Sequence, residues 1–156
     1  MSGADRDRTD LSHVGPAGDV RMVDVGGKPP LRRRAVARAT VRMGEGTAER
    51  LRTLPKGDAL VTAQIAGVLA AKRTSELIPL CHSLPLSHVA VRLDVHPSSV
   101  EIEAAAETVA QTGVEMEALV AATVAALTVY DMAKAIDKTM SVDDVRLVEK
   151  TKEEPV

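Results

Sequence analysis

The chain has 156 residues, the size of one domain built around a single hydrophobic core. Its 45% hydrophobic and 27% charged residues exclude a disordered or fibrous chain. A formal net charge of -2 provides no basic field to grip a nucleic-acid backbone, and Tyr130, the only aromatic residue, cannot form a surface on which bases stack. We therefore expect no nucleic-acid partner.

The cysteine content and the length of the apolar runs limit the cellular compartment and the chemistry that we expect for the chain. Cys81 is the only cysteine, so an intrachain disulfide is impossible, and no wholly apolar run is long enough for a signal peptide or a membrane span. We expect a cytoplasmic protein without a membrane partner. The four histidines lack the spacing of zinc ligands, so no metal site is predicted, and Cys81 is expected to be a small buried side chain.

The first half of the chain predicts one strand and two helices. Alternating side chains over residues 34–43 indicate a strand, and residues 44–55 predict a turn and a short helix with Thr47 as its N-cap. Residues 58–74 predict a helix capped by Asp58. Along this helix the residues at helical spacing are Val61, Ile65, Val68, Leu69 and Lys72.

The second half predicts a hairpin, a long helix and a final strand. Residues 80–85 form an irregular connector between two prolines, and residues 89–95 and 100–106 alternate on either side of a turn at 96–99. Thr112 and Glu115 have the spacing of a capping box that opens a helix reaching about residue 137. One side of that helix carries Leu119, Thr123, Leu127, Tyr130 and Ala133. Residues 144–150 predict a strand.

This order of elements predicts the fold class. It is α+β, a ferredoxin-like βαββαβ arrangement in which an antiparallel sheet carries both helices on one face. Enzymes, regulators and RNA-binding modules all use this arrangement, so the fold itself does not choose a function.

Asp131 and Lys134 are three residues apart on the second main helix, where a carboxylate and an ammonium group can pair. The spacing alone is typical of a surface ion pair. The chemical alternative is an acid and a base held on one rigid element, with the pKa of Lys134 lowered toward neutrality by partial burial or by nearby cations.

Cations are scattered along the chain. Lys72-Arg73 near a helix C-terminus and Arg32-Arg33-Arg34 are explained by the helix dipole and by solvation, or alternatively by an anion pocket. Lys56 lies just before a helix N-terminus, where an anion is favoured. Because neither a Walker sequence nor a dinucleotide fingerprint is present, any phosphate site must be assembled from separate cations.

Three further polar residues are considered as candidates for function. His82 in the connector can act as a proton shuttle or an anion ligand. Glu115 is accounted for by the capping box, whereas Glu117 is expected to be exposed to solvent. The residues alone thus indicate a small domain with a basic pocket and one acid-base pair, and they do not select a reaction.

Several blocks, in one order, resemble the cyclic pyranopterin monophosphate synthase family. The resemblance covers residues 22 to 150, and the combination of blocks is more specific than any single one. The matching blocks are Met22-Val23-Asp24-Val25, Lys56-Gly57-Asp58, Ile65-Ala66-Gly67, residues 70–74, residues 77–82, residues 112–119, Tyr130-Asp131-Met132 and Lys134-Ala135.

The resemblance implies a reaction and an assembly. The family converts 3',8-cyclo-7,8-dihydroguanosine 5'-triphosphate into cyclic pyranopterin monophosphate and pyrophosphate during molybdenum-cofactor biosynthesis, so the chain is expected to be a lyase. It implies a homohexamer, a trimer of dimers, with active sites at subunit boundaries. No cofactor is expected, although Mg²⁺ could accompany the triphosphate.

The resemblance also assigns roles to residues. Asp131 and Lys134 correspond to catalytic positions, for which we expect proton transfer. The remaining positions are expected to bind the substrate, and the basic ones among them to hold its triphosphate: Leu80, Cys81, His82, Glu115, Met116, Glu117, Arg33, Lys56, Lys72, Arg73 and Lys150. The chain departs from the family at Leu54-Pro55, Ser83, Gln111 and Ala133, none of which is a catalytic position.

We expect residues 1–21 to be a flexible arm, residues 22–150 a single catalytic domain and residues 151–156 a frayed C-terminus. One rival hypothesis is a non-catalytic ferredoxin-like module that binds a phosphorylated ligand. A second is RNA binding by the sheet, which predicts a steep dependence of affinity on salt.

Overall fold

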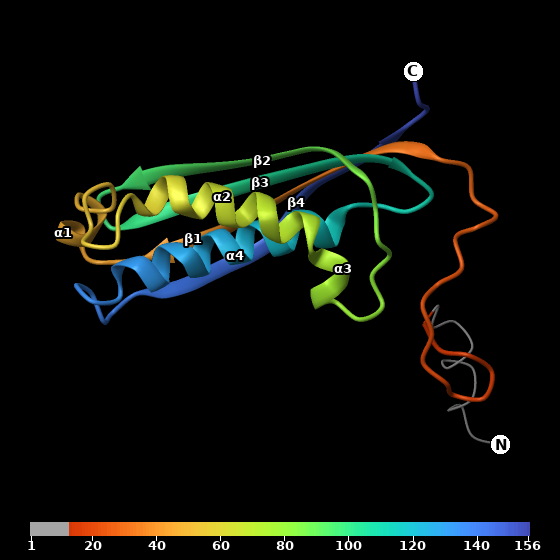
Figure 1. Ribbon diagram of the computed structural model, residues 1–156, viewed down its shortest axis with the longest axis horizontal. Helices are drawn as coiled ribbons and strands as arrows, with labels where there is room; N and C mark the ends of the chain where they lie inside the picture. Colours follow the sequence, from red (N-terminus) through yellow and green to blue (C-terminus); the bar gives the residue numbers. More distant parts are fainter. Residues whose placement is uncertain (1–12) are drawn as a thin grey trace.

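The computed structural model describes residues 13–156, which form a four-stranded antiparallel sheet covered on one face by two long helices (Figure 1). The sheet order is β2-β3-β1-β4. In chain order the elements are β1 (Leu31–Arg42), α1 (Glu45–Ala48), α2 (Ala59–Lys72), α3 (Thr74–Leu77), β2 (Leu86–His96), β3 (Ser99–Ala110), α4 (Glu115–Ala133) and β4 (Ser141–Glu153). The predicted α+β class and βαββαβ order are confirmed, with α1 and α3 as short additions.

The strands are longer than their alternation indicates. β1 begins at Leu31, opposite Ala110 of β3, and β4 continues to Glu153, opposite Arg32 of β1. Residues 151–153, expected in the frayed terminus, therefore belong to the sheet. The difference arises because backbone hydrogen bonds to a neighbouring strand hold these residues whether or not their side chains alternate.

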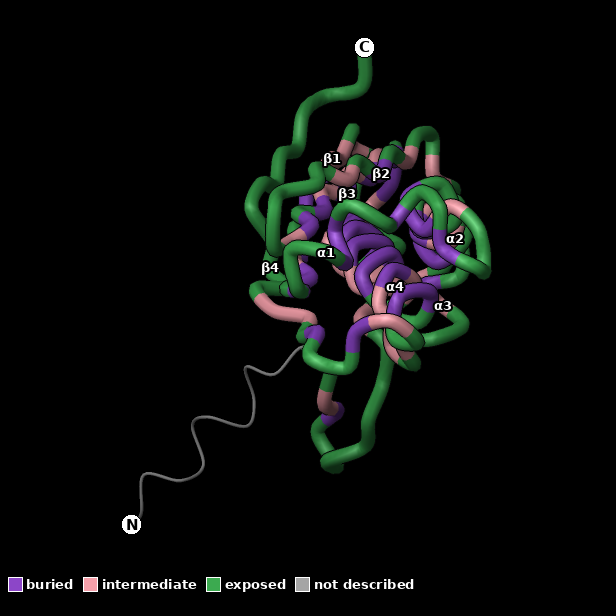
Figure 2. The backbone as a smooth tube through the Cα atoms, turned by 90° about the vertical axis from the view of Figure 1, so that its left-hand side faces the viewer, coloured by how far each residue is buried: buried purple, intermediate pink, exposed green. Residues whose placement is uncertain are grey.

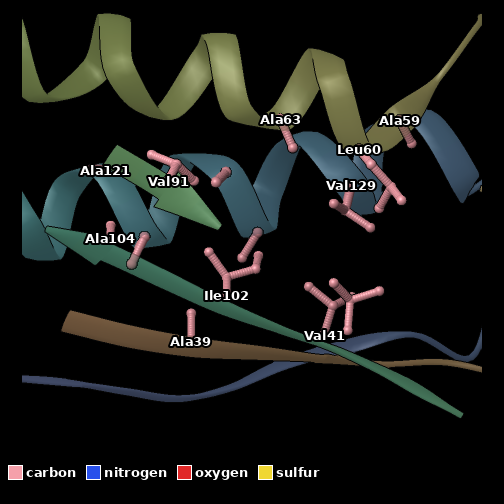
Figure 3. Close-up of a cluster of buried hydrophobic side chains, with 14 of the residues drawn as sticks. Ala39, Val41, Ala59, Leu60, Ala63, Val91, Ile102, Ala104, Ala121 and Val129 are labelled. Atoms are coloured by element: carbon pink, nitrogen blue, oxygen red, sulfur yellow. The ribbon is translucent and has the colours of Figure 1, made fainter. Parts of the chain in front are cut away.

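Small side chains predominate on the buried faces of the two long helices, and larger residues such as Leu60 and Ile102 fill the remaining space toward the sheet. The buried face of α2 includes Ala59, Ala63 and Gly67, and the buried face of α4 is mostly alanine (Figures 2 and 3).

Of the apolar residues predicted at helical spacing along α2, Val68 is half-buried against the core. The other three point outward instead. Their exposed fractions are 47% for Val61, 57% for Ile65 and 47% for Leu69.

The predicted apolar side of the last helix is therefore partly wrong. Leu127 is 53% exposed, whereas Ala122, Ala126 and Val129 are fully buried. Spacing alone could not separate the two sides because α4 is apolar around most of its circumference, and the sheet accepts the side with the smaller residues. By length and composition α4 could cross a membrane, but 56% of it is buried inside the domain, so it is a core helix.

Helix caps agree with the sequence at one position and differ at two. Asp58 caps α2 as predicted, accepting hydrogen bonds from the amides of Leu60 at 2.9 Å and Val61 at 3.2 Å. Thr47 is not an N-cap, because α1 starts at Glu45 and the Thr47 hydroxyl instead donates to Asp137. The capping box is also wrong, since Glu115 is the first residue of α4 and its carboxylate pairs with Lys150.

The open face of the sheet is covered by ion pairs. Because successive side chains of a strand point to opposite faces, Arg34 and Arg38 of β1 lie on this face. Arg38 pairs with Glu103 at 2.8 Å, and Arg34 pairs with Glu107 and Glu149 on the two neighbouring strands. Arg33 lies on the opposite face, with the helices, and this separates it from the other two arginines of its run.

A substitution at Gly67 tests how closely α2 approaches α4. A Cβ atom at this position would lie 2.9 Å from Cγ2 of Val91 and 3.0 Å from the carbonyl oxygen of Ala121. We predict that Gly67→Ala lowers the free energy of unfolding by about 1 kcal/mol or more, because overpacking (~1–3 kcal/mol) outweighs the gain in helix propensity (~1 kcal/mol).

Gly46→Ala in α1 is the matched control, since a Cβ there meets nothing within 4 Å. Chemical denaturation at a fixed protein concentration measures both variants. Equal stability of Gly67→Ala and Gly46→Ala would contradict the packing described above.

Candidate active site

Two groups of predicted site residues occupy opposite ends of the domain. The first, called here the lysine-aspartate cluster, consists of Lys56, Asp131 and Lys134. Lys134 Nζ lies 2.7 Å from Oδ1 of Asp131, and Lys56 Nζ lies 3.2 Å from Oδ2 of the same carboxylate. Lys56 comes from the loop before α2, and the other two residues come from the C-terminal end of α4. The N-terminal end of α2 and the C-terminal end of α4 both lie near α1 (Figure 1).

The opposite charges in this cluster stabilise the ionised forms of one another. Hydrogen bonds from Lys134 and then from Lys56 lower the pKa of Asp131, and the hydrogen bond to Asp131 raises the pKa of Lys134. The expectation that the pKa of Lys134 moves toward neutrality is therefore wrong for the single chain, where about half of each side chain is exposed. At neutral pH the cluster presents a carboxylate that can accept a proton and an ammonium group that can donate one.

The second group lines a pocket of about 580 Å³, called here the loop pocket. The connector after α3 and the start of α4 supply the predicted residues of its wall, which are Leu80, Cys81, His82, Glu115, Met116 and Glu117. Pro79 and Pro85 bracket the connector, and its backbone runs without regular structure across the end of the helices. A different hollow, of about 610 Å³ and lined by Glu49 and His96, contains none of the predicted site residues.

Glu117 is the buried acid of the loop pocket. Only 3% of the residue is exposed, so the expectation of solvent exposure is wrong, because the first turn of α4 places this side chain inward. Within residues 13–156 its Oε1 has Cys81 Sγ at 3.9 Å and its Oε2 has no hydrogen-bond partner. Burial raises the pKa of Glu117 and also that of the half-buried Cys81 thiol. A ligand with N–H groups would satisfy the unpartnered oxygen.

The chain segment before β1 closes the pocket on another side. His82 Nε2 lies 2.7 Å from the carbonyl oxygen of Val23, so in the neutral imidazole the proton is on Nε2 and Nδ1 is left to accept. Val25 and Lys28 also line the pocket. Figure 1 shows this segment running beside the connector. Residues 1–12 of the predicted arm lie outside the described residues.

Three charged side chains meet beside the loop pocket. Glu115 pairs with Lys150 of β4, and Arg33 of β1 donates to the backbone carbonyl of Gln111 at 3.3 Å. Burial alone would raise the pKa of Glu115, but the hydrogen bond from Lys150 and the charges of Lys150 and Arg33 bring it below its usual value. The structure thus brings the predicted basic residues Arg33 and Lys150 together.

The remaining predicted cations, Lys72 and Arg73, are exposed at the C-terminal end of α2, next to α3 and the connector. They lie at the loop-pocket end of the domain.

The two groups of predicted site residues are far apart in one chain. Glu117 and Asp131 lie near opposite ends of α4, about 21 Å apart along its axis. Groups that act on the same reacting atoms need separations of about 3 Å. Within one chain, the predicted site residues are therefore two half-sites.

Some lining residues were not assigned roles from the sequence. Val23, Val25, Thr112 and Gly113 line the loop pocket, and they belong to blocks that carried the family resemblance, so the signal was present. In residues 13–156, no group of three or more His, Cys, Asp or Glu side chains is arranged to hold a metal ion.

Comparison with known proteins identifies the family. The model of the MoaC family matches residues 22–153. The chain belongs to the MoaC family. Relatives named cyclic pyranopterin monophosphate synthase share high identity along nearly their whole length: 58% in Roseiflexus sp. (strain RS-1), covering 92% of this chain and 93% of the relative, 53% in Chloroflexus aggregans, covering 90% and 87%, and 51% in Nitratidesulfovibrio vulgaris, covering 94% and 93%. The predicted family membership is confirmed.

The burial of Glu117 predicts a pH-dependent effect on stability. A carboxyl group whose pKa is raised by folding destabilises the folded state as pH rises from the unfolded pKa, about 4.3, through the folded pKa. Glutamine carries no charge at any of these pH values. We predict that the free energy of unfolding of Glu117→Gln at pH 8 exceeds that of the wild type by about 1 kcal/mol, and that this difference disappears near pH 4.

Denaturant titrations at the two pH values measure this difference. Glu76→Gln is the control, since Glu76 is exposed in α3 and its replacement should have little effect at either pH. An effect of Glu117→Gln that does not change with pH would be inconsistent with a buried, charged Glu117.

Proposed function

We propose that the chain is a cyclic pyranopterin monophosphate synthase that acts in molybdenum-cofactor biosynthesis, with 3',8-cyclo-7,8-dihydroguanosine 5'-triphosphate as its substrate. Family membership supports the activity. The observation that carries the chemistry is the Asp131 carboxylate held between the ammonium groups of Lys134 and Lys56. Forming the new rings requires several proton transfers, and closing the cyclic phosphate releases pyrophosphate.

The charge states assign a role to each residue of the lysine-aspartate cluster. Asp131 is assigned as the proton acceptor, since it is the one carboxylate of the cluster and both of its oxygens face ammonium groups. Lys134 is assigned as the proton donor, since its ammonium group lies 2.7 Å from that carboxylate. Lys56 is close enough to orient Asp131 and, with its positive charge, to stabilise negative charge on the departing phosphates.

The loop pocket has the character expected of a site for the guanine-derived rings. Apolar residues border it, and Glu117 forms part of its wall. Oε2 of Glu117 is buried without a hydrogen-bond partner in residues 13–156, and a rotation of the side chain would bring it to a ring N–H group. The cations around it, Arg33, Lys72, Arg73 and Lys150, are assigned to the triphosphate. Mg²⁺ bound to the triphosphate would enter with the substrate.

The two half-sites require a second copy of the chain. The lysine-aspartate cluster lies at the N-terminal end of α2, and Lys72, Arg73 and the connector lie at its C-terminal end. A two-fold axis across the middle of α2 would place the helix antiparallel to its copy. The cluster of one subunit would then lie beside the loop pocket of the other, which completes the site.

The exposed stripe of α2 fits this arrangement. Val61, Ile65 and Leu69 follow one another at i, i+4 and i+8, and Ile65 is near the midpoint of α2. Apolar residues on an isologous interface pack against the same residues of the copy, and Ile65 would meet its own counterpart. We assign this face to the dimer of the proposed homohexamer, a trimer of dimers, and we propose a cytoplasmic location without a nucleic-acid or membrane partner.

The catalytic assignment predicts a loss of turnover. Asp131→Asn and Lys134→Ala should each lower kcat by roughly 10²–10⁴-fold, because each removes one proton-transfer group. The value of kcat is measured from the release of pyrophosphate and the formation of the pterin product with the cyclic dihydro-GTP substrate. Asp143→Asn, a change at an exposed ion pair of β4, should leave kcat unchanged.

These measurements also distinguish the rival classes. A non-catalytic binding module would retain ligand affinity in every variant and give no product with the wild-type chain. An RNA-binding module would show affinity for single strands that falls steeply with salt. Absence of product from the folded wild-type protein would reject the enzymatic proposal.

The two-copy site predicts complementation. Asp131→Asn and His82→Ala chains should each be nearly inactive alone. After co-expression, half of the dimers are mixed, and each mixed dimer contains one site with both changes and one site with neither. We therefore predict recovery of about a quarter of wild-type activity. Mixed oligomers as inactive as the two parents would place the whole site within one chain.

A further inference from the structure

Asp137 is a nearly buried carboxylate that joins two distant parts of the chain at the lysine-aspartate end of the domain. Its exposed fraction is 9%. Oδ2 accepts hydrogen bonds from the Gly44 amide and the Thr47 hydroxyl, both at 2.8 Å. Oδ1 accepts from the amide and the hydroxyl of Thr139, at 2.8 and 2.7 Å. The hydroxyl of Thr139, the amide of Gly44 and the other donors strongly lower the pKa of Asp137.

On one side, Asp137 is continuous with the end of α4. Its amide donates to the carbonyl of Ala133, the last residue of that helix, at 3.1 Å. The Lys134 amide donates to Tyr130 in the same way, at 2.9 Å. The turn that presents Lys134 therefore lies between the helix and the anchored carboxylate.

On the other side, the carboxylate fixes the start of the segment that carries Lys56. Gly44 and Thr47 mark the entry into α1. A Cβ atom at position 44 would lie 3.4 Å from Oδ2, in van der Waals contact, so the backbone at Gly44 passes directly against the carboxylate. After α1, the buried Leu51 and Leu54 attach the segment to the core. Two residues later, Lys56 reaches back to Asp131.

We propose that Asp137 is a positioning residue for the reaction, one that sets the placement of Lys56 against Asp131 and Lys134 by fastening the start of α1 to the turn after α4. The proposal rests on the proposed function, because it concerns the geometry of the same cluster. Exposed side chains on separate segments hold a 3.2 Å contact poorly on their own, so the backbone that carries them has to be fixed.

Asp137→Asn tests this role while keeping the shape of the side chain. The amide NH₂ group would face hydrogen-bond donors on whichever side it lies, so at least one of the two attachments is lost. We expect kcat to fall roughly tenfold to a hundredfold, as for small misplacements of catalytic groups. The acidic limb of the kcat–pH profile should move to higher pH, because loss of the Lys56 contact allows the pKa of Asp131 to rise.

The shift of the acidic limb separates positioning from a general loss of stability, which would lower kcat without moving the limb. Asp143→Asn is the matched control, since it makes the same chemical change at an exposed ion pair with Arg42. Its kcat and its pH profile should equal those of the wild type. A folded Asp137→Asn protein with wild-type kcat and pH profile would overturn the proposal.

Thr47 provides a second, milder variant in case Asp137→Asn does not fold. Thr47→Val removes the hydroxyl that donates to Oδ2 and nearly keeps the volume, whereas Thr47→Ser keeps the hydroxyl. We expect Thr47→Val to show a several-fold lower kcat with the same direction of limb shift, and Thr47→Ser to restore both. Equal behaviour of the two variants would contradict the proposal.

A crystal structure of Asp137→Asn or Thr47→Val gives a readout that does not depend on turnover. We expect Lys56 Nζ to lie beyond hydrogen-bonding distance of Asp131 Oδ2, compared with 3.2 Å in the wild type. An unchanged distance would reject the positioning role even if the enzyme were inactive. Absence of product from the wild-type chain would instead reject the proposed function, so the two failures are distinguishable.

Discussion

The close contact between α2 and α4 is the constraint on which the rest of the structure depends. Gly67 approaches the backbone of Ala121, and the surrounding buried residues of both helices are mostly alanine. Because the helices approach each other and the sheet closely through small side chains, Val61, Ile65 and Leu69 of α2 point outward. The same contact fixes the two ends of α2 over the two ends of α4, and each end carries one of the two groups of predicted site residues.

The division of the site follows from this geometry. Asp131 and Lys134 lie at the end of α4 where α2 begins, and Glu117 lies at the end where α2 finishes. A single chain therefore presents acid-base chemistry in one place and a ring-sized pocket with cations in another. In the proposed dimer, the outward Ile65 stripe and the separation of the half-sites have one common explanation. In that proposed arrangement, the outward apolar stripe of α2 serves the interface between subunits.

The sequence predicted the order of the elements and the pairing of Asp131 with Lys134, because periodicity and local spacing determine them. Asp58 was recognised as a cap since its partners are its immediate neighbours in the chain. Long-range contacts were beyond such reasoning. Thr47 and Glu115 both fit local capping rules, but Asp137 and Lys150 bind them from distant parts of the chain. Glu117 was expected in solvent because its neighbour Cys81 comes from a connector whose path has no periodic signal. The family resemblance assigned site residues near both ends of α4, and only the fold revealed how far apart they lie in one chain.

The central claim is that the lysine-aspartate cluster of one subunit and the loop pocket of another act on the same substrate molecule. A crystal structure of the Asp131→Asn protein with the cyclic dihydro-GTP substrate bound tests this most directly. The account predicts guanine-derived rings next to Glu117 and His82 of one chain, with Lys134 and Lys56 of a second chain within hydrogen-bonding distance of the substrate. A substrate whose contacts all come from a single chain, or one bound far from Lys134 of every chain, would contradict it.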